Sequence, residues 1–182
     1  MRRKTLLTLS LGLGLLAGSA AYGQRVAKID TDRPSPDDVV TAVVGGKKVT
    51  VEYGRPSGKG RNLFGGLVPY GQVWRTGANE ATAFTVDGDF MVGTIHVPAG
   101  SYALFTIPGE KEWTLILNKT VKQWGAFKYE EKTDLGRAAM KVGASAKAVE
   151  KLTITIEPGA GNRGVLRIAW DRTEATIDLM AH

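Results

Sequence analysis

The sequence predicts an all-β protein, an antiparallel β-sandwich or flattened barrel of about ten strands with one long ordered loop and little helix. Short apolar runs recur with a spacing of roughly 8 to 12 residues, which is typical of such folds. Turn dipeptides such as Gly45-Gly46 and Pro108-Gly109 separate the runs, and no stretch of the sequence sustains a helical period. Together these observations predict the fold class.

The first 23 residues have the composition of a secretory signal peptide. Three basic residues at positions 2–4 precede an apolar run over residues 6–17, and small residues follow over 18–21. The run is too short and too rich in small residues to predict a strong membrane span. We therefore expect residues 1–23 to be removed on export, leaving a periplasmic or extracellular protein with no membrane span.

The composition of the chain excludes several classes of function. There is no cysteine, which excludes disulfides, thiolate catalysis, zinc–thiolate sites and a lipidated N-terminal cysteine. The formal net charge is +6 at pH 7, and part of that charge belongs to the leader. The remainder is too small to indicate nucleic acid, so we expect no nucleic-acid partner. Because there is no cysteine to carry a lipid, we also expect no lipidation. We also expect no cofactor.

Residues 24–38 are expected to form an extended lead-in, because Pro34 and Pro36 interrupt any regular element there. Within this region, residues 36–39 could form one short helical turn. Four aspartates raise the question of a calcium site: Asp30, Asp32, Asp37 and Asp38. Their spacing lacks the glycine and the closing glutamate of an EF-hand loop, so we expect no bound metal.

A single β-sandwich domain is expected over residues 39–182, and its first half has the pattern of a meander. Gly45-Gly46 predicts a two-residue hairpin between the strands on either side of it. Asp87-Gly88 predicts a second hairpin, because the apolar residues of 84–86 mirror those of 90–92 around it. Further strands are expected over residues 94–97, 102–107 and 113–117.

The second half of the domain shows cleaner alternation. Residues 152–157 alternate between apolar and polar side chains, as in a strand with one solvated side. Residues 136–149 fit either a helix or a strand, and we favour a strand near 137–142 because two glycines would interrupt a helix. The last two strands are expected over residues 165–170 and 175–180.

The stretch from Tyr53 to Phe84 breaks this rhythm and reads YGRPSGKGRNLFGGLVPYGQVWRTGANEATAF. Connections in a compact domain are usually short, so one of this length is either functional or disordered. Its many aromatic and apolar residues argue for order. We therefore expect any functional site of the protein to lie in this stretch.

The first half of the stretch is cationic and rich in glycine. Arg55, Lys59 and Arg61 could together bind phosphate, sulfate or carboxylate, and the glycines between them leave backbone N–H groups open to an anion. The order of residues is not that of a P-loop. The alternative interpretation is a solvated, mobile loop over residues 54–66 that binds nothing.

The second half of the stretch contains a tighter group of residues. Trp74, Arg75, Asn79 and Glu80 could form a sugar site, in which the tryptophan stacks on the ligand and the polar groups surround it. In the alternative interpretation, Arg75 and Glu80 form a structural ion pair that fixes the turn, and Trp74 belongs to the core. The sequence leaves both interpretations open.

Catalysis has thinner support in the sequence. Glu80 could serve a carboxylate-dependent hydrolase, with Glu52 as the candidate second carboxylate. Only two histidines occur, so we expect neither a His-dependent triad nor a multi-histidine metal site, and His96 should lie in the core or on a sheet face. The aromatic residues of 123–129 are expected to cover one end of the sandwich or, alternatively, to line a carbohydrate platform.

The long stretch closely resembles the signature of domain of unknown function family 2911, whose members are mostly exported bacterial proteins. The likeness continues through VPAGSYALFTIP, EWTLILNK, QWGAFKY and LRIAWDRTEATIDL, so it covers almost all of the chain after the leader. The resemblance implies an exported protein with a β-rich fold. It implies no activity, and no functional residue is transferred from it.

Three functions fit these patterns. The first is a binding module that takes a small polar or anionic ligand, or a glycan, in the long stretch. The second is an envelope hydrolase that uses Glu80, and the third is a structural or interaction module without a ligand. A pocket that gathers Arg55, Lys59, Arg75, Asn79 and Glu80 would favour the first two functions, whereas full internal pairing of the last three residues would favour the third.

Overall fold

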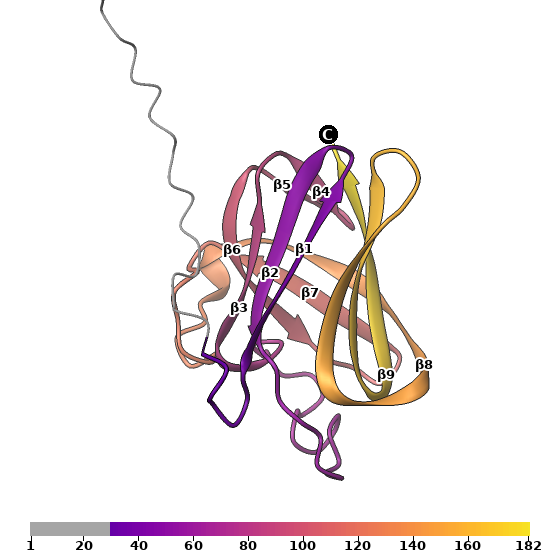
Figure 1. Cartoon of the computed structure of the whole chain (residues 1–182). Coiled ribbons are helices and arrows are strands. Elements are labelled where there is room, and N and C mark those ends of the chain that lie inside the picture. The colour runs from indigo at the N-terminus through magenta and orange to yellow at the C-terminus, as the bar shows by residue number, and fades with distance from the viewer. Residues whose placement is uncertain (1–29) are drawn as a thin grey trace, which may run out of the picture.

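The computed structural model describes residues 30–182, so the predicted signal peptide lies outside the described residues. The described chain contains nine β-strands and one 3₁₀ helix, η1 (Glu131–Thr133), and the predicted all-β class is confirmed (Figure 1). No helix within residues 30–182 is long and apolar enough to cross a membrane. The strands are β1 (Asp37–Val44), β2 (Lys47–Gly54), β3 (Ala78–Val86), β4 (Phe90–Val92), β5 (Ile95–Val97), β6 (Gly100–Ile107), β7 (Glu112–Asn118), β8 (Asp134–Pro158) and β9 (Arg163–Ala181).

All of these strands belong to one antiparallel sheet with the order β1-β2-β3-β6-β7-β8-β9-β4-β5. The start of β8 pairs with β7, and the rest of β8 pairs with β9. Figure 1 shows β8 and β9 as one long, bent hairpin that lies beside β1. Because of this bend, the two parts of the sheet face each other across one apolar core, as in a sandwich.

The core lies between the two parts of the rolled sheet. Its largest fully buried side chains come from five different strands: Trp113, Trp170, Tyr53, Phe84 and Phe90. The alternation predicted in residues 152–157 is confirmed, since the apolar side chains are buried and those between them are not. Burying one large apolar side chain contributes roughly 1.5–3 kcal/mol, so this core accounts for the stability of a chain without disulfides.

The predicted hairpin at Gly45-Gly46 is confirmed by the pairing of β1 with β2 on either side of it. Both glycines have positive φ, 57° and 80°, which is the backbone that a two-residue type I′ turn needs. Gly45 is also closely packed, because a Cβ there would lie 2.9 Å from atoms of both Asn162 and Ala181. The turn at residues 45–46 therefore packs against both the turn and the C-terminal end of the β8–β9 hairpin.

The predicted hairpin at Asp87-Gly88 is wrong. β3 pairs with β2 and β6, whereas β4 pairs with β9 and β5. Asp87 extends the pairing with β2 instead: its Oδ1 accepts a hydrogen bond from the Lys48 amide (2.7 Å), and its own amide donates to the Lys48 carbonyl (3.2 Å). The chain then crosses to the other part of the sheet, where buried Phe90 and Val92 pair with the end of β9.

Two further expectations concern element boundaries. The helical turn considered for residues 36–39 does not form, because β1 begins at Asp37 and pairs there with Gly54. The ambiguous residues 136–149 form part of strand β8, as favoured from the sequence. The pairing of β8 with β9 shifts register between Ala144 and Thr153, and this irregular part of β8 contacts the long connection between β2 and β3.

Candidate functional site

A pocket of about 330 Å³ lies at the end of the sandwich where residues 55–77, the connection between β2 and β3, meet β9. Ser35 of the lead-in also lines the pocket, so three parts of the chain that are distant in sequence meet here. We call it the Arg–Trp pocket after its two arginines and two tryptophans: Arg61, Trp74, Arg75 and Trp170.

The connection is ordered because its aromatic side chains pack against those of the sheet. The ring centroid of Phe64 lies 4.8 Å from that of Trp113 and 6.0 Å from that of Trp74. Trp74 is nearly parallel to Trp170, with 6.1 Å between centroids and 11° between planes. Aromatic pairs of this kind contribute about 0.5–1.5 kcal/mol beyond their buried area. The tryptophan wall of the pocket is therefore fixed by the core.

Hydrogen bonds to β6 fix the backbone next to this wall. Trp74 and Thr106 exchange both amide–carbonyl hydrogen bonds, at 2.8 and 2.9 Å. Thr76 has a φ of 56°, and its hydroxyl lies 3.0 Å from the hydroxyl of Thr106, while its carbonyl accepts from the hydroxyl of Thr82 at 3.0 Å. A β-branched residue rarely adopts positive φ. This buried threonine network therefore holds the turn, and with it Arg75, in one conformation.

Arg75 is half-buried and has no carboxylate partner within residues 30–182. Its Nε donates one long hydrogen bond to the carbonyl of Gly77 (3.3 Å), and burial lowers the pKa of its guanidinium. Nη1 packs against Gly125, where a Cβ would lie 3.0 Å from it. A charge removed from water normally has a counter-ion. Because Arg75 has none among these residues, its N–H donors are available for an anionic ligand.

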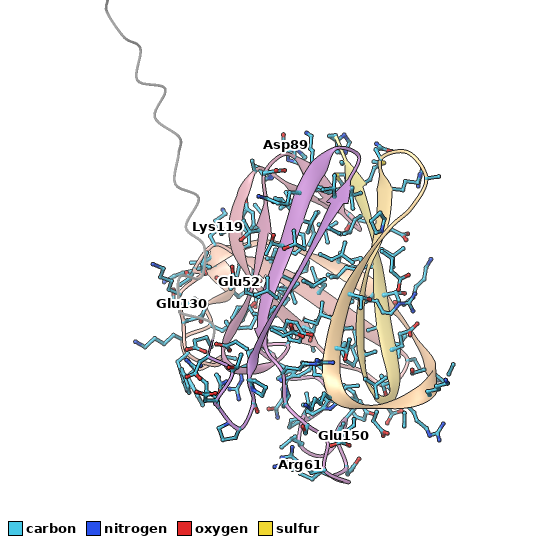
Figure 2. All side chains as sticks on the ribbon, viewed as in Figure 1. Glu52, Arg61, Asp89, Lys119, Glu130 and Glu150 are labelled. Carbon is cyan, nitrogen blue, oxygen red and sulfur yellow. The ribbon has the colours of Figure 1, made fainter. Side chains whose placement is uncertain are left out.

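Arg61 lines the same pocket from an exposed position on the connection. Its Nε donates to the carbonyl of Gly58 (2.9 Å) and its Nη2 to the carbonyl of Ser57 (2.6 Å), and it forms no ion pair in the described part of the chain. The side chain also lines a neighbouring pocket of about 320 Å³ that contains Glu150. Figure 2 shows Arg61 and Glu150 at the same end of the molecule. Arg61 is therefore the second cation at the Arg–Trp pocket.

Two of the predicted cations, Arg55 and Lys59, do not line the Arg–Trp pocket. Nε and Nη2 of Arg55 donate to residues 152–153 of β8, each at 3.0 Å. The amides of Lys59 and of the glycine before it both donate to Glu150, at 2.8 and 2.7 Å, while the Lys59 side chain is exposed. The loop over residues 54–66 is thus anchored along β8 and not free in solvent.

Asn79 and Glu80 bind the lead-in and do not line the pocket. Nδ2 of Asn79 donates to the Ser35 carbonyl (2.9 Å), and Oε2 of Glu80 accepts from Nη1 of Arg33 (2.8 Å). The ion pair considered between Arg75 and Glu80 is wrong, because Glu80 pairs with Arg33 and Arg75 with no carboxylate of residues 30–182. Of the predicted site residues, the pocket gathers Arg61, Trp74 and Arg75.

The aromatic residues of 123–129 do not cover the end of the sandwich as a group. Trp124 and Phe127 are 57% and 84% exposed, so the expected cover is wrong for both. Only Tyr129 packs against the sheet. Trp124 and Phe127 also lie outside the residues that line the Arg–Trp pocket, so they share no cleft with Trp74 there.

Two residues of the pocket, Ser35 and Trp170, lie outside the stretch in which the sequence predicted a site. Ser35 lies in the lead-in, where the two prolines indicate only an extended chain. Trp170 lies in an expected strand and is 1% exposed, so its pattern is that of a core residue. No local signal places either residue at a pocket. Both become visible only when the lead-in and β9 are brought against the connection between β2 and β3.

The fold and the pocket together define a class of protein, an antiparallel β-sandwich with a cationic, tryptophan-lined pocket at one end. The chain belongs to the family described as protein of unknown function (DUF2911), whose model matches residues 35–179. This range contains every described residue that lines the pocket. No curated protein and no solved structure matches the chain.

Proposed function

We propose that this protein is exported and binds a small anionic ligand in the Arg–Trp pocket. One observation carries the proposal: the half-buried guanidinium of Arg75 is held at the pocket without a carboxylate partner in residues 30–182. Arg61 adds a second guanidinium that is bound only to backbone carbonyls. Two guanidinium groups in this state favour phosphate, sulfate or carboxylate over a neutral ligand.

Burial makes Arg75 the stronger of the two anion-binding groups. Two unit charges 4 Å apart attract each other by about 1 kcal/mol in water and by about 4 kcal/mol at an effective dielectric constant of 20. The environment of the half-buried Arg75 is closer to the dielectric constant of 20, and that of the exposed Arg61 is closer to water. We therefore expect the affinity for an anion to depend more on Arg75 than on Arg61.

The size and lining of the pocket limit the rest of the ligand. Small-molecule sites usually range from about 300 to 1,000 Å³, and this pocket, at about 330 Å³, is at the lower end. That volume suits one sugar ring or a similarly compact molecule. The half-buried ring of Trp74 offers a flat surface on which a sugar or planar ring packs. The best-supported ligand is a compact ring that carries a phosphate, sulfate or carboxylate group.

The two alternative functions receive less support. A carboxylate-dependent hydrolase needs an acid and a base at the site, but no Asp or Glu is among the described residues that line the pocket, and Glu80 is bonded to Arg33. A module without a ligand predicts that Arg75, Asn79 and Glu80 are all paired internally. Asn79 and Glu80 are paired in this way, whereas Arg75 has one long hydrogen bond to a carbonyl and no carboxylate partner in residues 30–182.

The proposal of export is supported by the leader pattern of residues 1–23. Expression of the full chain in a bacterial host, followed by intact-mass measurement of the periplasmic and cytoplasmic fractions, tests it. We expect a periplasmic species that has lost residues 1–23 or a few residues fewer. A protein of full mass confined to the cytoplasmic fraction would contradict the proposal.

Calorimetric titration tests the proposal of anion binding. Glucose 6-phosphate, glucose 6-sulfate and glucuronate serve as probes, with glucose as the neutral match. Arg75→Gln should weaken binding of the anions about 10- to 100-fold, because a charge-assisted hydrogen bond contributes about 1.5–3 kcal/mol. Arg163→Gln, at the β8–β9 turn and outside the Arg–Trp pocket, is the matched control and should leave the affinity unchanged. Equal binding of glucose, or an unchanged affinity in Arg75→Gln, would contradict the proposal.

A further inference from the structure

The lead-in forms a closed turn just before β1. The amide of Asp37 donates to the carbonyl of Asp30 (3.0 Å), and the amide of Asp30 donates to Oδ2 of Asp37 (3.2 Å). Within the turn, Oδ2 of Asp30 accepts from Nε of Arg33 (3.0 Å). The two ends of residues 30–36 therefore meet, as in a small Ω-loop. We call residues 30–36 the strap.

Among the described residues, three polar contacts join the strap to β3 and to the residue after β2. Nη1 of Arg33 donates to Oε2 of Glu80 (2.8 Å), and Nδ2 of Asn79 donates to the carbonyl of Ser35 (2.9 Å). The third contact is a backbone hydrogen bond from the amide of Arg55 to the carbonyl of the residue after Ser35 (2.8 Å). Asn79 and Glu80 directly follow Ala78, which lines the pocket beside Ser35. One short stretch of β3 thus holds the strap against the pocket.

The strap has no apolar anchor among the described residues. None of its residues is fully buried, and none belongs to the apolar core. The connection between β2 and β3 differs in this respect, because Leu63 and Val68 are buried in that core. Segments with few buried apolar contacts open at a small fraction of the global free energy of unfolding. The position of the strap therefore depends on its polar contacts.

We infer that the strap is a movable wall of the Arg–Trp pocket, and that Asn79 and Glu80 hold it closed through Ser35 and Arg33. These two side chains are then positioning residues that control access to the pocket, without touching the ligand. The identity of the ligand rests on the proposed function above. The movement of the strap does not, so it is measured in the protein without ligand.

Amide hydrogen exchange measures the opening of the strap directly. The amides of Asp37 and Arg55 report on it, because their acceptors are carbonyls of the strap. Asn79→Gly keeps the left-handed backbone (φ 63°) and removes the side-chain amide that binds Ser35. The backbone amides of both reporters should therefore exchange about 2- to 10-fold faster. Glu80→Gln should accelerate them about 2- to 5-fold. The amide of Trp74, bonded to β6, is the internal control and should not change.

Tryptophan fluorescence tests whether the opened strap exposes the pocket. The 57% exposed Trp124 is first replaced in Trp124→Phe, so that the pocket tryptophans dominate quenching by neutral acrylamide. Asn79→Gly in this background should raise the quenching constant. Unchanged exchange of the reporter amides in both variants would overturn the inference. Faster exchange with unchanged quenching would also overturn it, because the strap would then move without being a wall of the pocket.

A double-mutant cycle separates the assigned contact from general loosening. Arg33→Met and Glu80→Gln remove the two sides of one ion pair, so the double variant should accelerate exchange by less than the product of the single effects. Fully multiplicative effects would show that the two residues act through separate contacts and would overturn the assignment.

Stopped-flow release of inorganic phosphate tests the ligand separately. In Asn79→Gly and Glu80→Gln, phosphate should dissociate faster by the same factor as the reporter amides exchange. Failure of phosphate to bind the unmodified protein would count against the proposed function alone.

Discussion

Arg33 and Arg75 lie near the same pocket and have opposite surroundings. Arg33 has carboxylate oxygens of Glu80 at 2.8 Å, Asp30 at 3.0 Å and Asp37 at 4.0 Å, and its hydrogen bonds to Glu80 and Asp30 raise its pKa. Arg75 has one carbonyl at 3.3 Å, and burial lowers its pKa. One arginine is therefore surrounded by counter-charges, and the other has none in the described chain.

This difference separates the structural cations from those available to a ligand. A guanidinium that is paired with carboxylates connects two parts of the fold, as Arg33 connects the strap to β3. A guanidinium that has lost water without gaining a counter-ion lowers the stability of the protein unless something else binds it. The comparison assigns Arg55 to the structural group as well, because it bonds to β8 and lies 3.5 Å from Asp38.

The largest effect is expected at Tyr53, next to the structural cation Arg55. Its hydroxyl donates to Asp38 (3.2 Å) and accepts from the Ile154 amide (3.1 Å), and burial raises its pKa from 10.0 to about 12. Between these pH values the unfolded chain loses the tyrosine proton while the folded protein keeps it, so stability falls as pH rises. The loss should reach about 3 kcal/mol.

Urea unfolding at pH 8, 10, 11 and 12 measures this loss, and Tyr53→Phe is the matched variant. Because other groups also titrate in this range, the prediction concerns the difference between the two proteins. Tyr53→Phe should lose less stability than the unmodified protein above pH 10. Parallel stability curves for the two would show that Tyr53 ionises as readily in the folded protein as in the unfolded chain.

The next effect concerns Gly125, on the side of the ligand-binding cation. It has a φ of 65°, and a Cβ there would lie 3.0 Å from both Nη1 of Arg75 and the ring of Phe127. Gly125→Ala should lower the free energy of unfolding by about 2 kcal/mol, since left-handed backbone costs a non-glycine residue about 1–2 kcal/mol. It should also weaken anion binding, because the guanidinium has to move.

Gly161→Ala is the control for Gly125→Ala. Gly161 also has a φ of 65°, but a Cβ there would meet no atom within 4 Å. The two variants therefore share the backbone strain and differ in the contacts with Arg75 and Phe127. Denaturant unfolding and anion titration of both should show similar losses of stability, with a loss of affinity in Gly125→Ala alone. Equal affinities would indicate that the position of Arg75 does not matter to the ligand.

Most of the fold could be predicted because its signals are local. Alternation in residues 152–157 and the positive-φ pair Gly45-Gly46 depend only on neighbouring residues. The false hairpin at Asp87-Gly88 shows where local signals fail. Apolar residues on both sides of that turn suit a hairpin, but β4 pairs instead with the end of β9, far along the chain. Only the packed core decides between the two.

The site was predicted in part for the same reason. Trp74 and Arg75 are neighbours in a segment whose length and composition single it out, so the sequence alone brings them to attention. The partner of Glu80 is Arg33, 47 residues earlier, and no spacing rule connects them. The difference between a paired and an unpaired arginine is a property of tertiary structure. The sequence therefore predicted candidate cations but did not distinguish the structural ones from those available to a ligand.

The smallest effect is the most direct test of the comparison between Arg33 and Arg75. Arg33→Met should lower the free energy of unfolding, because it leaves Asp30, Asp37 and Glu80 without this cation. Arg75→Met keeps the aliphatic packing and removes a half-buried charge, so it should leave stability unchanged or raise it by up to about 1 kcal/mol.

Urea unfolding followed by tryptophan fluorescence measures both variants, first without and then with a saturating anion. A ligand that binds only the folded state stabilises it by mass action. The anion should therefore stabilise the unmodified protein and Arg33→Met, and it should stabilise Arg75→Met much less. Equal losses of stability in the two variants, with equal gains from the anion, would show that Arg75 is as structural as Arg33. A loss of stability in Arg33→Met alone would establish that the surroundings of an arginine, and not its place in the sequence, determine its role at this pocket.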